Sequence, residues 1–383
     1  MRLRAKSIFL LVFVAALWAP VAPAWAVSEG VEEEAIGRQY DQEIAITMGF
    51  YQDKKLSEYV ERIGRKVLAQ VHEPMFEFHF KVVDDAMVNA FALPGGYVYI
   101  TRGMLATLND EAELAGVLGH EIGHVIGHHS VKQMRKSIAQ ALLALGGIML
   151  SPEIRSNAGA WITVTTTLGQ QMISGYGREM EMESDQEGLI LAYNAGYDPG
   201  AIVSFLSTMR NIEKLGFRTY HSFMASHPDT RDRITEAQVK SSLLQARGEK
   251  KERHRDRFMD NMEGLKYGKP RWKGETAPPF KIVIHKVVEG ETFRSITRDV
   301  SGDVGQAFEI AAINGLEIDS PLSAGMKVKA LVAADVADVI KIRVEKDKYE
   351  IGVRVGDGKN GPAEREKGGQ ADRGTKGKDS PGP

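Results

Sequence analysis

The feature that most constrains this chain is the string His120-Glu121-Ile122-Gly123-His124, which lies in a segment with helical spacing. Leu118, Val125 and Ile126 flank it, so we expect a buried helix. Two histidines four residues apart lie on one helix face, roughly 6 Å apart along the axis. Such imidazoles can bind one tetrahedral zinc ion, with the intervening glutamate beside the open metal position. The string therefore predicts a metal centre on a helix.

The composition limits which residues can complete this centre. The chain has 383 residues and no cysteine, which excludes disulfides, thiolate zinc ligands and a cysteine nucleophile. Any zinc must therefore be held by His, Glu or Asp, and we expect one Zn2+ per chain. The formal net charge is −2, and the charged segment 247–257 interleaves acids with bases. We therefore predict a solvated helix face there and no nucleic-acid partner.

The spacing of the nearby histidines does not identify a third ligand. His128 lies two turns beyond His120, about 12 Å along a helix axis, which is too far for the same ion. The alternative pattern H-E-x-x-H-x-x-G-x-x-H requires a histidine at position 130. This chain has Ser130 there, and His129 falls one residue early. That metzincin pattern remains the second interpretation.

An acidic segment at 178–185 offers further candidates. Glu181 and Asp185 are four residues apart, so one could bind the metal while the other holds a ligand imidazole. Glu179 and Glu183 form a competing pair with the same spacing, and the glutamates could instead form a solvated helix face. The residues alone favour Glu181 without excluding the others.

Hydrophobic periodicity predicts an α+β fold in which helices dominate. We expect helices in residues 27–70, from Asp110 through His124, at about 177–194 and at 200–265. We expect strands at 76–83, 88–93 and 97–101, with a hairpin turn at 94–96. The apolar region 138–176 predicts a buried helical hairpin, or alternatively a lid or lipid-contacting element.

The ends of the chain differ in composition from its centre. Residues 1–26 combine a basic start, a short apolar run and the sequence Ala24-Trp25-Ala26, which predicts a cleavable signal peptide and export to a bacterial periplasm. An uncleaved anchor is the alternative. The remaining predicted regions are a catalytic domain at 27–268, a linker at 269–281, a compact module at 282–333, a β-hairpin at 334–355 and a disordered tail at 356–383.

Several motifs together resemble the gluzincin metallopeptidases related to HtpX, BepA and the CAAX prenyl proteases. The resemblance covers roughly residues 32–267. The motifs that carry it are Asn89–Gly96, His120-Glu121-x-x-His124, Glu181-x-x-x-Asp185, Gly196–Pro199 and Ser226–Pro228. The resemblance implies a gluzincin fold and a zinc-dependent metalloendopeptidase.

The resemblance also implies roles for single residues. His120, His124 and Glu181 would bind zinc, and Asp185 would hold a ligand imidazole from behind. Glu121 would act as the general base on the zinc-bound water.

Three further residues are assigned in the same way. His227 would either stabilise the transition state or occlude the metal, whereas Ser226–Pro228 could simply be a helix start. Asn89 and Ala90 would belong to the edge strand along which a substrate chain aligns.

The segment 282–333 resembles a LysM module, a small β-α-α-β fold that binds N-acetylglucosamine chains. The similar stretches are 285–296, 310–316 and 322–328, although Glu289-Gly290-Glu291-Thr292 stands where Pro-Gly-Asp-Thr is usual. The resemblance implies peptidoglycan binding, and the alternative is a degenerate module that only packs on the catalytic domain.

These expectations combine into one functional hypothesis. The chain would be an exported endopeptidase, and the family resemblance implies that its polypeptide substrates are unfolded or misassembled envelope proteins, including outer-membrane proteins. The alternative is an envelope chaperone or scaffold, tethered to peptidoglycan, with little proteolysis.

Overall fold

The computed structural model describes residues 29–137, 176–214, 223, 226–227, 230–268 and 280–334. Several predicted regions therefore lie wholly or almost wholly outside the described residues. They are the signal peptide at 1–26, the apolar region 138–176, the linker 269–281, the extension 334–355 and the tail 356–383.

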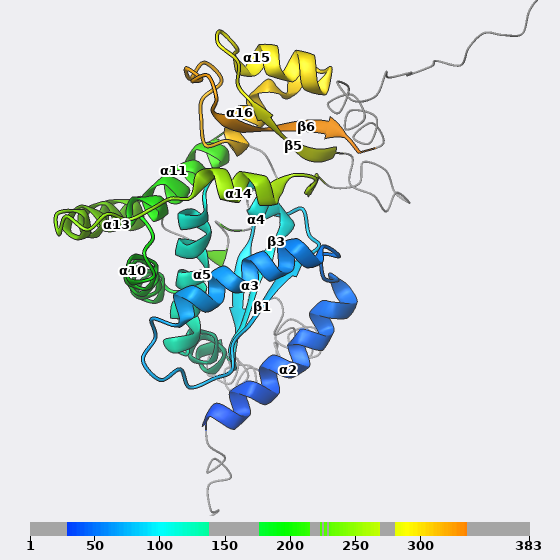
Figure 1. Ribbon diagram of the computed structural model, residues 1–383. Coiled ribbons are helices and arrows are strands. Elements are labelled where there is room, and N and C mark those ends of the chain that lie inside the picture. The colour runs from blue at the N-terminus through cyan, green and yellow to red at the C-terminus, as the bar shows by residue number, and fades with distance from the viewer. Residues whose placement is uncertain are drawn as a thin grey trace, which may run out of the picture. The chain divides into compact units, whose positions relative to one another are not determined.

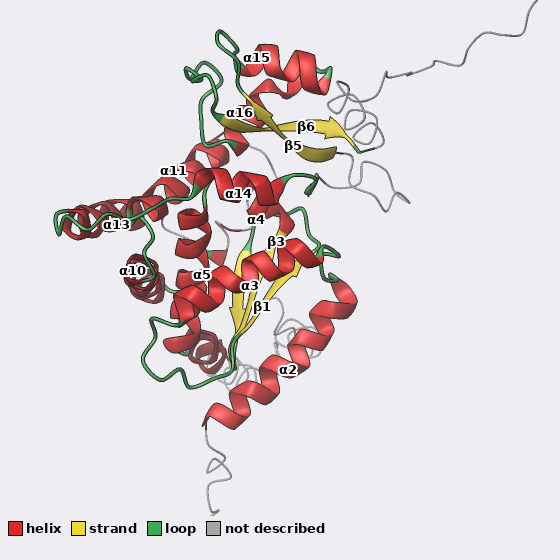
Figure 2. Ribbon diagram, viewed as in Figure 1, coloured by secondary structure: helices red, strands yellow, loops and turns green. Residues whose placement is uncertain are grey.

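The described part of the chain is dominated by helices, as predicted (Figures 1 and 2). The helices are α2 (Glu29–Thr47), α3 (Lys54–Leu68), α4 (Arg102–Thr107), α5 (Glu111–Ile126), α10 (Arg178–Asn194), α11 (Gly200–Lys214), α13 (Thr230–Gln245), α14 (Arg255–Met262), α15 (Phe293–Ile296) and α16 (Ala307–Ile313). The strands are β1 (His79–Val83), β2 (Ala90–Leu93), β3 (Tyr97–Thr101), β4 (Lys266–Tyr267), β5 (Phe280–Lys286) and β6 (Lys327–Ala333).

Strands β1, β2 and β3 form a three-stranded sheet that packs against α5 and α2. Its order is β1-β3-β2, with β1 parallel and β2 antiparallel to β3. The predicted hairpin around 94–96 is therefore confirmed, whereas the strand predicted from residue 76 begins only at His79. Among the described residues β2 has one strand neighbour, which makes it an edge strand.

The two faces of this sheet are covered by different elements. Ala90 and Ala92 of β2 belong to the main core together with Ile122 of α5. On the opposite face, Leu93 packs in a smaller cluster with Ile44 of α2. Helix α2 therefore covers the sheet face that points away from α5 (Figure 1).

The start of α5 is capped twice. The Asp110 side chain accepts a hydrogen bond from the Glu113 backbone nitrogen at 2.8 Å, which satisfies one of the free N–H groups of the first turn. The carbonyl oxygen of Arg253 accepts from the backbone nitrogens of Glu111 and Ala112. The helix ends at Ile126, one residue before Gly127.

The segment that supplies Arg253 corrects one expectation. Helix was predicted throughout 200–265, with a helical charged face at 247–257, but no helix covers 248–254. Arg253 instead contacts Asp110 and Asp198, each at 2.8 Å. These ion pairs and the backbone cap on α5 favour an extended segment over a continued helix.

Helices α5 and α10 approach each other backbone to backbone. A Cβ atom at Gly188 would lie 2.5 Å from the backbone nitrogen of His120, and one at Gly119 would lie 2.8 Å from the Gly188 carbonyl oxygen. Both distances are too short for a side chain, so only glycine permits this approach. It brings the first two turns of α10 against the histidine-bearing part of α5.

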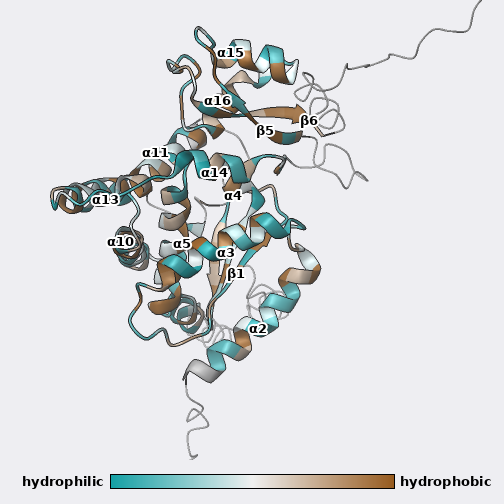
Figure 3. Cartoon of the chain, in the orientation of Figure 1, coloured by the Kyte–Doolittle hydropathy of each residue, from teal (hydrophilic) through white to brown (hydrophobic). Residues whose placement is uncertain are grey.

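The C-terminal described segment contains the antiparallel pair β5–β6 and the helices α15 and α16 between them. Its order is therefore β-α-α-β, while its assignment as a LysM module stays a prediction. In Figure 3, β6 is coloured mainly as hydrophobic and α14 as hydrophilic. Within the described ranges, no helix combines the length and apolar character needed to cross a bilayer.

A buried lysine joins β6 to the sequence just before α5. The Lys329 ammonium nitrogen donates hydrogen bonds to the carbonyl oxygens of Ala106 and Leu108, both at 2.8 Å. Burial lowers the pKa of Lys329 well below its ordinary value. These two hydrogen bonds therefore fix the C-terminal segment directly to the region that leads into α5.

We predict that Lys329→Met lowers the free energy of unfolding by about 1–3 kcal/mol, because two buried carbonyl groups lose their donor. Chemical denaturation measures this change. Lys327→Met in the same strand is the matched control, since Lys327 forms a surface pair with Asp260 and its loss should matter far less. Equal effects of the two substitutions would contradict the assigned role of Lys329.

Candidate metal centre

Four buried side chains converge where α5 meets α10. His120, His124, Glu181 and His227 each offer one ligand atom, and these atoms all lie within 4.8 Å of one another. The Nε2 atoms of His120 and His124 are 3.0 Å apart. The Glu181 carboxylate oxygens lie 3.5 Å from His120 Nε2 and 3.4 Å from His124 Nε2. Nitrogen and carboxylate donors in this arrangement fit a zinc ion.

The Nδ1 atoms of His120 and His124, on the opposite side of each ring from Nε2, face other side chains. His120 Nδ1 lies 2.9 Å from Asp185 Oδ1, and His124 Nδ1 lies 2.9 Å from His129 Nδ1. Partners at Nδ1 fix the ring orientation and turn Nε2 toward the common centre. Burial lowers the pKa of His124, so its imidazole is in the neutral form that binds metals.

Arg233 of α13 supports the carboxylates from behind. Its guanidinium donates to both oxygens of Asp185 at 2.6 and 2.8 Å, and Nη1 lies 2.9 Å from Glu181 Oε2. The same Nη1 donates to the His227 carbonyl oxygen at 3.1 Å. One buried cation therefore fixes Asp185, Glu181 and the backbone at His227. The sequence carries no local signal for this role, since Arg233 lies about 50 residues from either carboxylate.

Glu121 is the remaining charged group at this centre. It is fully buried, and among the described residues neither of its carboxylate oxygens has a hydrogen-bond partner. Burial raises the pKa of Glu121 above its ordinary value, although His227 and His120 oppose the shift. A buried carboxylate without a partner is costly, which fits a group that faces a reacting water.

Glu181 is kept ionised by its neighbours. Burial alone would raise the pKa of Glu181, but the charge of His227 and hydrogen bonds from His124 and His227 lower it far below its ordinary value. An ionised carboxylate is the form that binds a metal.

His227 lies among the donors. Its Nδ1 is 3.2 Å from His120 Nε2 and 3.0 Å from Glu181 Oε1. Its Nε2 is 3.3 Å from the Ala90 carbonyl oxygen and 3.7 Å from a Glu121 oxygen. The ring therefore stands between the metal-binding group and the edge of β2.

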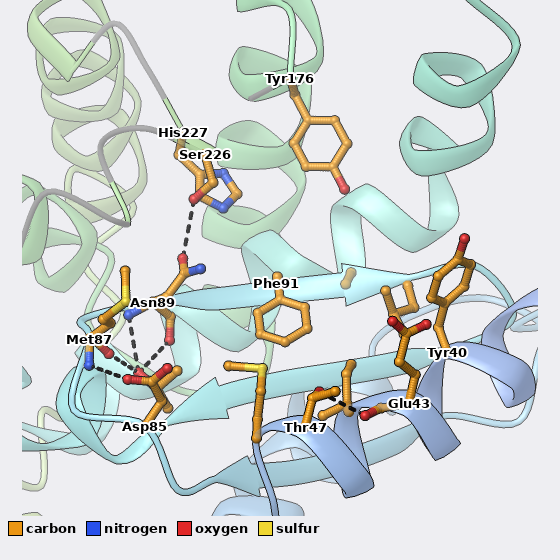
Figure 4. Close-up of a pocket in the computed structure, with 15 residues that line it drawn as sticks. Tyr40, Glu43, Thr47, Asp85, Met87, Asn89, Phe91, Tyr176, Ser226 and His227 are labelled. Carbon is orange, nitrogen blue, oxygen red and sulfur yellow. Dashed lines mark hydrogen bonds between the residues drawn. The ribbon is translucent and has the colours of Figure 1, made fainter. Parts of the chain in front are cut away.

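The outer edge of β2 runs past this group. The Thr101 backbone nitrogen donates to the Asn89 carbonyl oxygen. In the alternating pattern of an antiparallel pair, the backbone N–H and C=O groups of Ala90 and Ala92 therefore point away from β3. Besides the His227 contact of Ala90 O, the Ala92 carbonyl accepts from Ser130 Oγ at 3.2 Å. The Asn89 side chain accepts from Ser226 Oγ, also at 3.2 Å (Figure 4). Asn89 and Ala90 thus both contact the segment that carries His227.

The other sequence candidates lie elsewhere. His128 is beyond the end of α5, has a positive φ of 53° and pairs with Glu33 at 2.8 Å. His129 contacts the Nδ1 face of His124 and is not in the four-residue donor group. Glu179 and Glu183 are exposed. The spacing of His129 in the sequence did not reveal its contact with a ligand ring.

Comparison with known proteins identifies the domain that holds this centre. Residues 54–240 match the model of Peptidase family M48. The chain carries an M48 peptidase domain. The match includes all four donors and Glu121, and the predicted recognition of this gluzincin family is confirmed.

Curated relatives of the M48 domain are named as proteases or metalloendopeptidases. A beta-barrel assembly-enhancing protease of Yersinia pestis is 27% identical over 217 residues, covering 56% of this chain and 44% of the relative. A putative beta-barrel assembly-enhancing protease of Vibrio cholerae serotype O1 is 28% identical over 243 residues, covering 58% and 50%. The mitochondrial metalloendopeptidase OMA1 of Arabidopsis thaliana is 31% identical over 167 residues, covering 43% and 32%.

The chain therefore spans half the length of these relatives or less. The predicted enzyme class, a metalloendopeptidase, is confirmed by the family and by these names.

Proposed function

We propose that this chain is an exported, zinc-dependent endopeptidase that cleaves unfolded or misassembled envelope proteins. The observation that carries the proposal is the group of four buried donors beside the Glu121 carboxylate, which has no hydrogen-bond partner among the described residues. His120, His124 and Glu181 would hold the zinc ion. The alternative of a scaffold with little proteolysis is not favoured, because the M48 match includes the complete set of candidate catalytic residues.

The chemistry divides between the metal and the chain. When bound, a zinc ion supplies a Lewis acid that polarises the scissile carbonyl and lowers the pKa of the attacking water. Glu121 accepts the proton of that water and passes it to the leaving amine. Asp185 and His129 hold the two ligand imidazoles in place through Nδ1, so the geometry persists through the cycle.

Substrate would bind as an added strand along the outer edge of β2. The backbone groups of Ala90 and Ala92 face this edge, and backbone hydrogen bonds recognise an extended chain without a fixed sequence. In the structure, His227 and Ser130 contact these two carbonyl groups. Substrate binding would therefore displace both contacts.

His227 would close the centre at rest. Its Nδ1 lies 3.2 Å from His120 Nε2 and 3.0 Å from Glu181 Oε1, so with zinc bound it would compete with water and substrate for the metal. Once displaced by substrate, the same ring would stand near the developing oxyanion and could donate to it. Occlusion and transition-state stabilisation would then be successive roles of one residue.

The relatives' names support the substrate class. Two of them are called beta-barrel assembly-enhancing proteases, a name that places them with β-barrel assembly. We extend this to envelope and outer-membrane proteins as substrates of this chain, in the periplasm, after removal of residues 1–26.

We predict that Glu121→Gln retains one equivalent of zinc and loses casein cleavage by about 10²–10⁴-fold, because the general base is removed while the ligands remain. Zinc content and cleavage are measured on the same purified protein. Glu179→Gln is the matched control, since Glu179 is exposed and should be dispensable. Cleavage at the unsubstituted rate by Glu121→Gln would refute this mechanism.

We predict that His227→Ala speeds removal of zinc by a chelator, because the occluding ring is absent, and lowers casein cleavage, because the oxyanion loses its donor. The two rates are compared with those of the unsubstituted protein. A loss of cleavage with unchanged zinc removal would instead assign His227 to transition-state stabilisation alone.

We further propose that the LysM-like segment 282–333 binds peptidoglycan. The β-α-α-β order of this segment supports the proposal. The purified chain should sediment with isolated sacculi, and N-acetylglucosamine oligomers should release it. If the chain stays in the supernatant, the segment does not bind peptidoglycan and only packs on the catalytic domain.

A further inference from the structure

A cavity of about 380 Å³ lies between α2 and β2, beside the candidate metal centre. It is lined by one side of α2, by residues of β2 and the segment before it, and by Tyr176, Ser226 and His227. Figure 4 shows Phe91 in the middle of this space, with His227 and Tyr176 beyond β2 and Thr47 on the α2 side. His227 therefore belongs both to the donor group and to the cavity wall.

The cavity lies on one particular face of β2. Phe91 stacks on Tyr99 with ring centroids 4.9 Å apart, and both belong to the cluster that packs against α2. Ala90 and Ala92 point to the opposite face, into the main core. Side chains of neighbouring strands at the same register share a face. A chain added along the outer edge of β2 would therefore direct the side chain beside Phe91 into the cavity.

The lining of the cavity is mostly apolar. Ile44, Met48, Met87, Phe91 and Leu93 contribute to its walls. Such a lining favours apolar groups removed from water.

Acidic groups outnumber basic ones among the described residues that line the cavity. Glu43 and Asp85 contribute carboxylates, His227 is the basic side chain, and these described lining residues include no lysine or arginine. An acidic side chain would meet both an apolar wall and like charge, so it should be excluded.

We infer that this cavity receives one large apolar side chain, aromatic or long aliphatic, of a polypeptide bound along β2. The inference rests on the proposed peptidase function and adds a substrate preference to it. Folded proteins bury most such side chains, whereas unfolded chains expose them. Together, edge pairing and the cavity select an extended segment with an exposed large apolar residue, which unfolded proteins offer.

The test measures peptide binding separately from cleavage. Three fluorescent ten-residue peptides consist of serine and threonine except at one central position. That position is phenylalanine in the first peptide, aspartate in the second and serine in the third. Their affinities for the zinc-loaded full chain with Glu121→Gln are measured by fluorescence anisotropy. We expect the phenylalanine peptide to bind at least about tenfold more tightly than the serine peptide, and the aspartate peptide to bind most weakly.

Two tryptophan substitutions on α2 form a matched pair. Thr47 lines the cavity and is exposed, so Thr47→Trp should fill the space without disturbing the core. The adjacent Ile46 is 85% exposed and does not line the cavity. Thr47→Trp should abolish the preference for phenylalanine, whereas Ile46→Trp should retain it. Thermal unfolding of both variants verifies that the fold is intact.

The outcomes separate this inference from the proposed function. The assignment of the cavity would be overturned if the three peptides bound equally or if none bound. A phenylalanine preference that persists in Thr47→Trp would overturn it as well. Cleavage of the phenylalanine peptide by the unsubstituted protein is followed independently. Selective binding that Thr47→Trp removes, without any cleavage, would uphold the cavity and count against the peptidase function.

Discussion

The close approach of α5 and α10 is the constraint on which the candidate metal centre depends. Gly188 meets the backbone of His120 at a distance that admits no side chain. From that crossing, Asp185 lies about one turn back along α10 and Glu181 about two turns back, so both carboxylates face the histidines of α5. A wider separation would leave the carboxylates out of reach of the imidazoles. The two glycines, which have no side chain, are therefore as necessary for positioning the candidate metal ligands as the four donor side chains themselves.

Buried charge is balanced within the same small volume. Glu121, Glu181 and Asp185 are buried carboxylates, and unpaired charges of this kind would strongly destabilise the fold. Arg233 compensates Asp185 and Glu181, while its contact with the His227 carbonyl ties the balance to the segment that closes the site. Glu121 has no hydrogen-bond partner among the described residues, so its burial lowers stability at the carboxylate that is proposed to act as the general base.

Local patterns in the sequence predicted the elements that are defined by neighbouring residues. The helix start at Asp110, the hairpin at 94–96 and the helix end near residue 194 follow from capping and turn preferences. Contacts between distant segments were not predictable in this way. The inward orientation of Glu181, against the exposed Glu183, depends on the glycine crossing. The roles of Arg233 and His129, and the parallel pairing of β1 with β3, depend on which helices and strands meet, and no local pattern encodes this.

The contacts of Ala90 and Ala92 with His227 and Ser130 have a consequence for the solubility of the protein. An unpaired strand edge is a template for association with other chains, including further copies of the same protein. Here the chain's own side chains occupy two outward carbonyl groups of β2. A neighbouring copy that exposes no free extended segment gains little by displacing them. These contacts therefore disfavour pairing of the edge with a second folded copy, while the proposed unfolded substrates could still displace them.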